Sequence, residues 1–281
     1  MLTLVEVIIL GIVEGITEWL PISSTGHMLL VYKIFNINET DPFWSMFLVV
    51  IQFGAILAVI LMYFNRLWPF HRVHAKERGL YKVIDRKKLI MWLKIVVSCI
   101  PAMVVGLTID NWIEDHFYNY VVVSIMLIVY GVLFLIVENR NKTRKPETTS
   151  IDSISWGLAF MIGIFQMLAI IPGTSRSGAT ILGGILMGMS RKCASEYTFF
   201  LAVPTMLGAS VLKIAKFGNN FTMDQAMYLV LGMAVAFLVS IFAIRFLMKY
   251  IRSHDFKAFG WYRIVLGVIV LIAFAASAAL A

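Results

Sequence analysis

Long apolar runs alternate with short polar segments along most of this chain. Six runs each approach the roughly 20 residues that an α-helix needs to cross the hydrocarbon core of a bilayer. They cover residues 43–64, 89–109, 118–138, 194–214, 224–246 and 260–280. The segments between them carry charges, asparagine or proline, as the ends of membrane spans do. The pattern therefore predicts an all-α integral membrane protein, with a single membrane domain over residues 1–281.

Two further apolar segments, residues 2–33 and 153–189, are interrupted by proline and by a run of hydroxyl residues and glycine. Proline stops a helix, and serine or threonine offers a cap for the next one. The helices expected after these breaks, 25–33 and 178–188, are too short to cross a bilayer. We therefore expect two re-entrant hairpins. Unwound backbone at this depth must be buried in protein or line a cavity, so both turns are candidate sites.

The two interrupted segments, centred on residues 11–27 and 163–180, resemble each other. The letters GIVE at 11–14 recur as GIFQ at 163–166, and each is followed by proline, hydroxyl residues and glycine. A hairpin returns to its own side of the membrane, whereas three spans change sides. The second half, 151–281, should therefore be inverted relative to the first, 1–150. The chain is predicted to be an inverted repeat in which each half has one re-entrant hairpin and three transmembrane helices.

Charged residues make up only 14% of the 281 residues, and the mean hydropathy is +0.86. Soluble domains carry about 25% charged residues, so this composition excludes an ordinary soluble protein. The net charge of +8 comes largely from Lys and Arg clusters in the loops 65–88, 139–152 and 247–259. Anionic lipid and nucleic acid both attract such clusters, but their alternation with apolar spans favours topology, because cytoplasmic loops collect Lys and Arg. We therefore expect no nucleic-acid partner.

Placing these three basic loops in the cytoplasm fixes the remaining topology. The short loop 110–117, which has no Lys or Arg, then lies outside, as do both termini. The first hairpin enters the membrane from outside and the second from inside. We expect a multi-pass protein in which the two polar turns meet near the midplane.

Two glutamates lie in the first interrupted segment. Glu14 and Glu18 are four residues apart, so a helix places them on one face. An ionised carboxylate in the bilayer costs roughly 2.5–3.5 kcal/mol on insertion scales, so a pair of them points to a function. They fit a divalent-metal site or an acid–base pair. Caps or surface acids near the interface are the structural alternative.

Ser24 and His27 follow the glutamates. Serine, histidine and a carboxylate together are components of nucleophilic catalysis. Ser23 and Thr25 are either donors to a ligand or caps of the following short helix. A lone histidine is often a satisfied core residue, but the other four histidines fall in predicted loops, whereas His27 lies three residues after a serine.

The second turn supplies a fixed positive charge. Arg176 is the only basic residue between Lys145 and Arg191. An arginine at membrane depth needs a partner or an anionic ligand, and its planar fork suits phosphate. Hydroxyl donors, and glycines that let backbone amides approach, surround it: Ser175, Ser177, Thr180, Gly173 and Gly178. Gln166, which stands where the first segment has Glu14, is a further expected ligand of the phosphate groups.

Both turns end at helix N-termini, where free N–H groups and the helix dipole favour an anion. The expected ligand is an amphiphile with a phosphate head group, and the acid–base residues suggest its hydrolysis. The alternative is a lipid-phosphate flippase or transporter, because inverted repeats with broken helices and a midplane anion site also describe transporters. A carrier has little use for Glu14, Glu18 and His27 together, which favours an enzyme.

These residues closely resemble two motifs of the undecaprenyl-pyrophosphate phosphatase family, the bacitracin-resistance proteins. The family's glutamate motif is matched by EGITE at residues 14–18, and its continuation by LPISSTGH at residues 20–27. The family's PGxSRSxxT motif is matched by PGTSRSGAT at residues 172–180. Chain length, span number and spacing also resemble the family over the whole chain.

The resemblance implies a hydrolase of the bacterial plasma (inner) membrane. It would remove one phosphate from undecaprenyl pyrophosphate, a polyprenyl pyrophosphate lipid, to regenerate the monophosphate carrier used in cell-wall (peptidoglycan) synthesis. It also implies an extracytoplasmic site, a divalent cation such as Mg²⁺ or Ca²⁺, a homodimer, and bacitracin resistance. The positions that match the family's catalytic residues are Glu14, Glu18, Ser24, His27, Ser175, Arg176 and Thr180.

Two chemical routes fit these residues. In both, Arg176 and the surrounding donors hold the pyrophosphate and stabilise the charge on the transferred phosphoryl group, and Glu14 and Glu18 hold a metal or supply a base. In the first route Ser24 is the nucleophile, with His27 positioning it or protonating the leaving group. In the second, water attacks directly, with His27 or Glu18 as base and Ser24 as a ligand.

Overall fold

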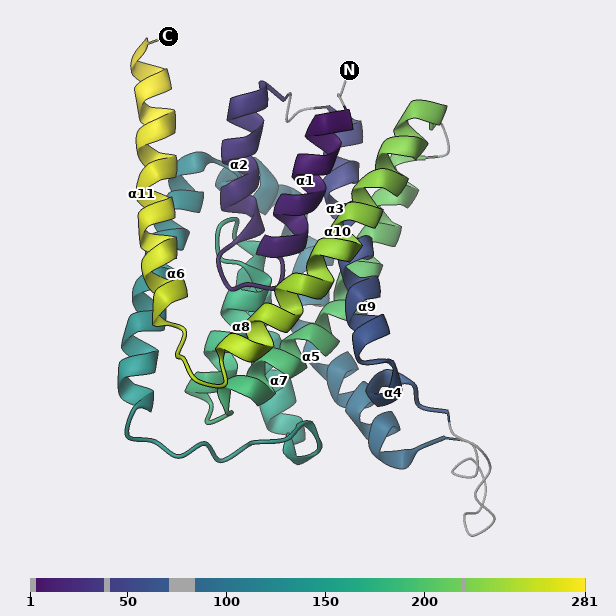
Figure 1. Cartoon of the computed structure of the whole chain (residues 1–281), viewed down its shortest axis with the longest axis vertical. Coiled ribbons are helices and arrows are strands. Elements are labelled where there is room, and N and C mark those ends of the chain that lie inside the picture. Colours follow the sequence, from purple (N-terminus) through teal and green to yellow (C-terminus); the bar gives the residue numbers. More distant parts are fainter. Residues whose placement is uncertain (1–3, 38–40, 71–83, 219–220, 281) are drawn as a thin grey trace.

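The computed structural model describes residues 4–37, 41–70, 84–218 and 221–280, and it is built from helices (Figure 1). The α-helices are α1 (Leu4–Thr17), α2 (Ser24–Phe35), α3 (Pro42–Met62), α4 (Phe64–Leu67), α5 (Arg86–Phe117), α6 (Tyr120–Asn141), α7 (Trp156–Met167), α8 (Arg176–Leu186), α9 (Arg191–Phe217), α10 (Met223–Tyr250) and α11 (Lys257–Leu280). This architecture confirms the predicted all-α fold class.

Within the described residues, six helices are long and apolar enough to cross a membrane: α3, α5, α6, α9, α10 and α11. They coincide with the six predicted spans, so the multi-pass prediction is confirmed. Several of them run past the predicted bounds; α5 covers Arg86–Phe117, whereas apolar composition predicted 89–109. The apolar run marks only the hydrocarbon core, and a helix continues through the headgroup region on either side.

Each interrupted segment forms a pair of short helices, as predicted. α1 ends at Thr17 and α2 begins at Ser24, and in the second pair α8 begins at Arg176. The second helices start slightly earlier than predicted because Ser23 and Ser175 cap them. In Figure 1 the α1–α2 pair lies toward the upper end of the molecule and the α7–α8 pair toward the lower end.

The recurring glycine of the two segments sets how closely the first helix of each pair packs. A Cβ atom on Gly11 would lie 3.0 Å from a backbone oxygen of α10, and one on Gly163 would lie 2.6 Å from a backbone oxygen of α5. α1 therefore lies directly against α10, and α7 against α5. One helical turn further on, Glu14 and Gln166 face the interior, and each side chain is only 2% exposed.

An ion pair with a buried carboxylate lies outside the polar turns. Glu138 on α6 is fully buried and accepts hydrogen bonds from Arg191 at the start of α9, at 2.6 Å from Nη2 and 2.9 Å from Nε. It also accepts from the backbone N–H of Phe256, just before α11, at 3.1 Å. This pair ties three helix ends together and has no contact with the polar turns among the hydrogen bonds described.

Candidate active site

The two polar turns share an unusual backbone conformation. Ser23 has φ 72° and Ser175 has φ 69°, in the left-handed region that residues other than glycine seldom adopt. The Ser23 hydroxyl oxygen accepts from the N–H of Gly26 at 3.5 Å, and that of Ser175 accepts from the N–H of Gly178 at 3.1 Å. Both serines thus act as helix caps, which was one of the two predicted roles of Ser23, whereas Ser175 was predicted as a ligand. Backbone strain of this kind costs about 1–3 kcal/mol and gathers at functional sites.

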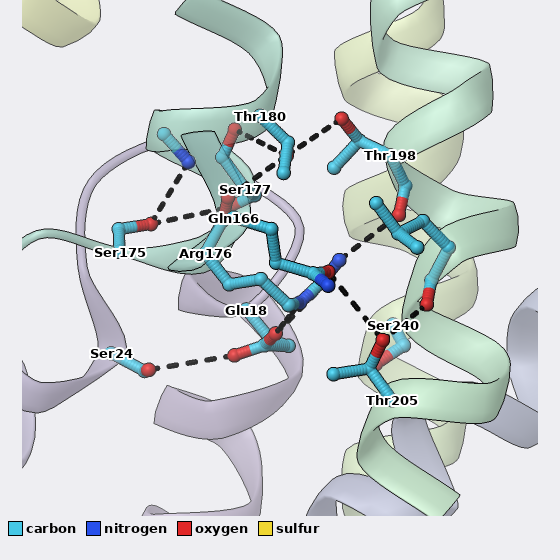
Figure 2. Close-up of polar contacts among 12 residues, drawn as sticks. Glu18, Ser24, Gln166, Ser175, Arg176, Ser177, Thr180, Thr198, Thr205 and Ser240 are labelled. Atoms are coloured by element: carbon cyan, nitrogen blue, oxygen red, sulfur yellow. Dashed lines mark hydrogen bonds and ion pairs between the residues drawn. The ribbon is translucent and has the colours of Figure 1, made fainter. Parts of the chain in front are cut away.

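An ion pair joins the two turns (Figure 2). Glu18 Oε1 accepts from Arg176 Nη2 at 3.1 Å and from Nε at 3.3 Å, and the two side chains are 9% and 11% exposed. Arg176 is the first residue of α8, where the helix dipole disfavours a cation, and the carboxylate offsets this. Its Nη1 also donates to the Thr198 carbonyl on α9 at 3.0 Å. The structure therefore brings together residues of the two motifs that are 158 positions apart.

Glu18 lies beside Ser24, and Glu14 lies beside Glu18. Glu18 follows the last residue of α1, but its N–H still bonds to the Glu14 carbonyl at 3.0 Å, so the two side chains keep one face. Ser24 Oγ donates to Glu18 Oε2 at 3.5 Å. The Glu14 carboxyl contacts the side chains of Glu18 and Gln52, and its buried Oε1 has no hydrogen-bond partner among the described residues. Two buried carboxyl groups in contact need a shared proton or a cation between them.

His27 contacts the backbone of this turn and a tyrosine on α11. Its Nδ1 is 2.7 Å from the Ser23 carbonyl oxygen, which can only accept, so Nδ1 carries the proton. Its Nε2 is 2.7 Å from the Tyr262 hydroxyl on α11, and the two rings are stacked at 5.6 Å. Both ring nitrogens are therefore engaged away from Ser24. Tyr262, which holds the ring, escaped the sequence prediction because nothing in the spacing links positions 27 and 262.

The hydroxyls that follow Arg176 tie α8 to its neighbours. Ser177 Oγ donates to the Leu20 carbonyl in the first turn at 3.3 Å. The Thr180 hydroxyl donates to the Arg176 carbonyl and accepts from the Thr198 hydroxyl, both at 2.8 Å. These contacts hold the arginine's own helix in place.

Two other predicted ligands contact neighbouring helices. Gly173 has φ +90°, and a Cβ there would lie 2.6 Å from the Val123 carbonyl oxygen, so only glycine fits this turn against α6. Gln166 donates to the Ser98 carbonyl at 3.5 Å and accepts from Thr205 Oγ1 at 3.4 Å, which links α7 to α5 and α9. Gln166 occupies the position in α7 that matches Glu14 in α1, but its hydrogen bonds go to Ser98 and Thr205 on neighbouring helices rather than to the carboxylates.

A cavity of about 430 Å³ opens beside the first turn. Glu14, Ser24 and Thr25 line it from the α1–α2 pair. The rest of its wall comes mainly from α2, α3 and α9, and consists of Met28, Tyr32, Trp44, Ser45, Leu48, Val49, Gln52, Tyr118 and Lys213. Arg176 is not among the lining residues and connects to them through Glu18 and Ser24. The cavity therefore presents a carboxylate and hydroxyls, and Glu18 lies between this lining and the Arg176 guanidinium.

Arg263 on α11 is another functional candidate that the sequence prediction missed. Its side chain is fully buried, and it donates to the Pro21 carbonyl of the first turn at 3.2 Å. It also donates to the carbonyls of Gly173 and Thr174 in the second turn, both at 2.9 Å. Its guanidinium lies 5.4 Å from the ring centre of Tyr130. One arginine thus fixes the position of both turns. The signal available in the sequence was an arginine that lies three residues inside a predicted membrane span.

Buried charges are expensive in a membrane protein, and two arginines are held here at a pair of strained polar turns. These features define a multi-pass membrane protein with a buried polar site. Comparison with known proteins narrows the class: residues 7–269 match the family model described as "Bacitracin resistance protein BacA". The chain belongs to this family, and the resemblance inferred from the two motifs is confirmed.

Curated relatives are similar over nearly their whole length. The chain is 55% identical to the undecaprenyl-diphosphatase of Enterococcus faecalis over 269 residues, which is 96% of both chains. It is 56% identical to the undecaprenyl-diphosphatase of Desulfitobacterium hafniense over 279 residues, which is 98% of both chains. The undecaprenyl-diphosphatase of Acetivibrio thermocellus is 52% identical over 276 residues, 98% of this chain and 99% of the relative.

Proposed function

We propose that this protein hydrolyses undecaprenyl diphosphate to undecaprenyl phosphate and inorganic phosphate in a bacterial plasma membrane. The reaction consumes one water and breaks the phosphoanhydride bond, which recycles the lipid carrier for cell-wall synthesis and gives resistance to bacitracin. The observation that carries this proposal is the Glu18–Arg176 pair, which brings the acids and Ser24 of one turn to the guanidinium of the other. The names of the relatives agree with it.

We propose that the chain is an inverted repeat of residues 1–150 and 151–281, with α1–α2 and α7–α8 as re-entrant hairpins. The matched packing of Gly11 and Gly163 and the matched caps at Ser23 and Ser175 support this arrangement. The Lys and Arg distribution supports both termini outside and a site that opens to the extracytoplasmic side. The homodimer stays a prediction.

The residues around Glu14 suit a divalent cation such as Mg²⁺ or Ca²⁺. Its buried Oε1 has no partner in the described part of the chain, and the oxygens of Glu18, Gln52 and Ser24 are the hard donors such ions prefer. The described residues include no group of three His, Cys, Asp or Glu side chains that would bind a metal alone, so a few protein oxygens would act together with substrate phosphate. A bound cation would neutralise charge on the transferred phosphoryl group.

Ser24 is the nucleophile in the mechanism that we propose. Its Oγ donates a hydrogen bond to Glu18 Oε2, which accepts the hydroxyl proton as Oγ attacks the terminal phosphorus. The anhydride bond breaks, the prenyl phosphate leaves with the bridging oxygen, and water then hydrolyses the phosphoserine. Arg176 stabilises the charge on the transferred group. His27 holds the start of α2 through Ser23 and Tyr262. Direct attack by water, with Glu18 as base, is the alternative route.

Purified wild-type protein in lipid vesicles should release inorganic phosphate from undecaprenyl diphosphate when a divalent cation is present. Glu14→Gln should lower the rate about a hundredfold or more and raise the cation concentration needed, because it removes a charged oxygen of the site. Glu147→Gln, at an exposed glutamate, should behave as wild type. Lipid transfer across the bilayer with no phosphate release by the wild type would establish a transporter instead.

Ser24→Ala should abolish a phosphoserine that rapid acid quenching traps in the wild type, and should slow phosphate release by roughly a thousandfold. Mass spectrometry of the quenched protein and a phosphate-release assay are the measurements. Ser253→Ala, at an exposed serine, is the matched control. Near-normal turnover of Ser24→Ala would favour direct attack by water.

A further inference from the structure

The cavity beside Ser24 extends well outward from the carboxylates. On α3 its wall runs from Gln52, beside Glu14, to Ser45, near the start of the helix. These positions are seven residues apart, or about 10 Å along a helix. Lys213, near the end of α9, lies at the outer level, where its Nζ donates to Ser45 Oγ at 3.3 Å. The cavity thus has an inner carboxylate end and an outer ammonium end.

Lys213 is the only Lys or Arg among the residues that line this cavity in the described part of the chain. The outer end also carries the Tyr118 and Ser45 hydroxyls, while Met28 and Leu48 supply apolar wall. An ammonium group with neighbouring hydroxyls suits a phosphate. Apolar side chains beside it suit the first carbons of an attached lipid.

We propose that Lys213 and Ser45 form a second phosphate subsite, which holds the lipid-linked phosphate while the terminal phosphate lies at Ser24. This inference rests on the proposed diphosphate hydrolysis and adds the direction in which the substrate lies. When the anhydride bond breaks, the bridging oxygen keeps the electron pair and the lipid-linked phosphate gains negative charge. That charge develops beside Lys213, which therefore stabilises the leaving group and also binds the monophosphate product.

A lysine near the end of a membrane helix also serves as an interfacial anchor, with its stem along apolar surface and its ammonium group in water. Lys216 is the matched control, because it lies three residues further along α9, is exposed, and does not line the cavity. An anchoring role would be shared by both lysines, whereas a phosphate subsite requires Lys213 alone.

The test is steady-state kinetics of the purified full-length protein in lipid vesicles, with farnesyl diphosphate as the prenyl diphosphate. Lys213→Met should raise KM about tenfold, the effect of losing one charge-assisted contact, and should weaken inhibition by farnesyl monophosphate by a similar factor. It should also lower kcat, because the leaving group loses the ammonium group that stabilises its developing charge. Lys213→Arg should restore most of these losses. Lys216→Met should match the wild type, and thermal unfolding should show that all variants are folded.

Binding of methylenediphosphonate, which cannot be hydrolysed, separates the subsite from turnover. Calorimetry should show weaker binding to Lys213→Met than to wild type and to Lys216→Met. Equal affinities, an unchanged KM in Lys213→Met, or equal losses in the two methionine variants would overturn the subsite. If the wild type binds the diphosphonate but releases no phosphate from any prenyl diphosphate, the proposed hydrolysis fails while the subsite stands.

Discussion

Arg176→Lys should lower the rate of phosphate release by about a hundred- to a thousandfold while the protein remains folded. Lysine keeps the positive charge but not the planar fork. It cannot contact Glu18 through two nitrogens and also donate to the Thr198 carbonyl, as Arg176 does. The guanidinium would no longer stabilise the charge of the transferred phosphoryl group. A phosphate-release assay on protein in lipid vesicles measures the effect.

Arg191→Lys is the matched control for this substitution. Arg191 also contacts a buried carboxylate, that of Glu138, through two nitrogens, at shorter distances than Arg176 and outside the polar turns. The control should therefore lower the unfolding temperature and leave turnover of the folded protein near the wild-type value. Equal losses of turnover in the two variants would mean that Arg176 acts through stability alone.

Arg263→Met should reduce both stability and turnover. The substitution leaves the carbonyls of Pro21, Gly173 and Thr174 buried without their donor, and each such group costs about 1–3 kcal/mol. The two turns would also lose the contact that sets their relative position, so we expect a fall in kcat larger than the change in KM. Lysine at this position should rescue part of the kcat loss. Thermal unfolding and phosphate release are the measurements.

Tyr130→Phe tests whether the ring beneath Arg263 acts through its aromatic face or through its hydroxyl group. Phenylalanine keeps the aromatic face under the guanidinium, so this variant should retain most activity.

Arg263→Met with wild-type turnover and unfolding temperature would contradict the positioning role. A loss of stability with unchanged kcat would show that Arg263 has only a structural role.

The amino-acid sequence predicted the spans and the two turns because both depend on local composition. Apolar runs of the right length gave the six helices, and proline with serine, threonine and glycine gave the breaks before Ser24 and Arg176. The approach of the two polar turns was also expected from the inverted repeat, but the direct contact of Glu18 with Arg176 was not, because an arginine at membrane depth can pair with a ligand as well as with a carboxylate.

The residues that escaped prediction act through contacts between distant helices. Arg263 and Tyr262 lie close to the start of the last predicted span, where polar side chains normally face the headgroups. Gln52 lies within an apolar helix and has no local partner, so its approach to Glu14 appears only once α1 and α3 are packed. Periodicity reports the face on which a residue lies, but not which helix covers that face.

The ion pair between Glu18 and Arg176 has a consequence for the order of synthesis. The ribosome adds the arginine 158 residues after the glutamate, which at 5–20 residues per second takes roughly 8–30 s. During that interval the first hairpin carries two carboxyl groups with no cationic partner from the second turn, so they must stay protonated or in contact with water. The nascent first half therefore remains incompletely folded during this interval. Insertion of the second half then completes the burial of both carboxyl groups.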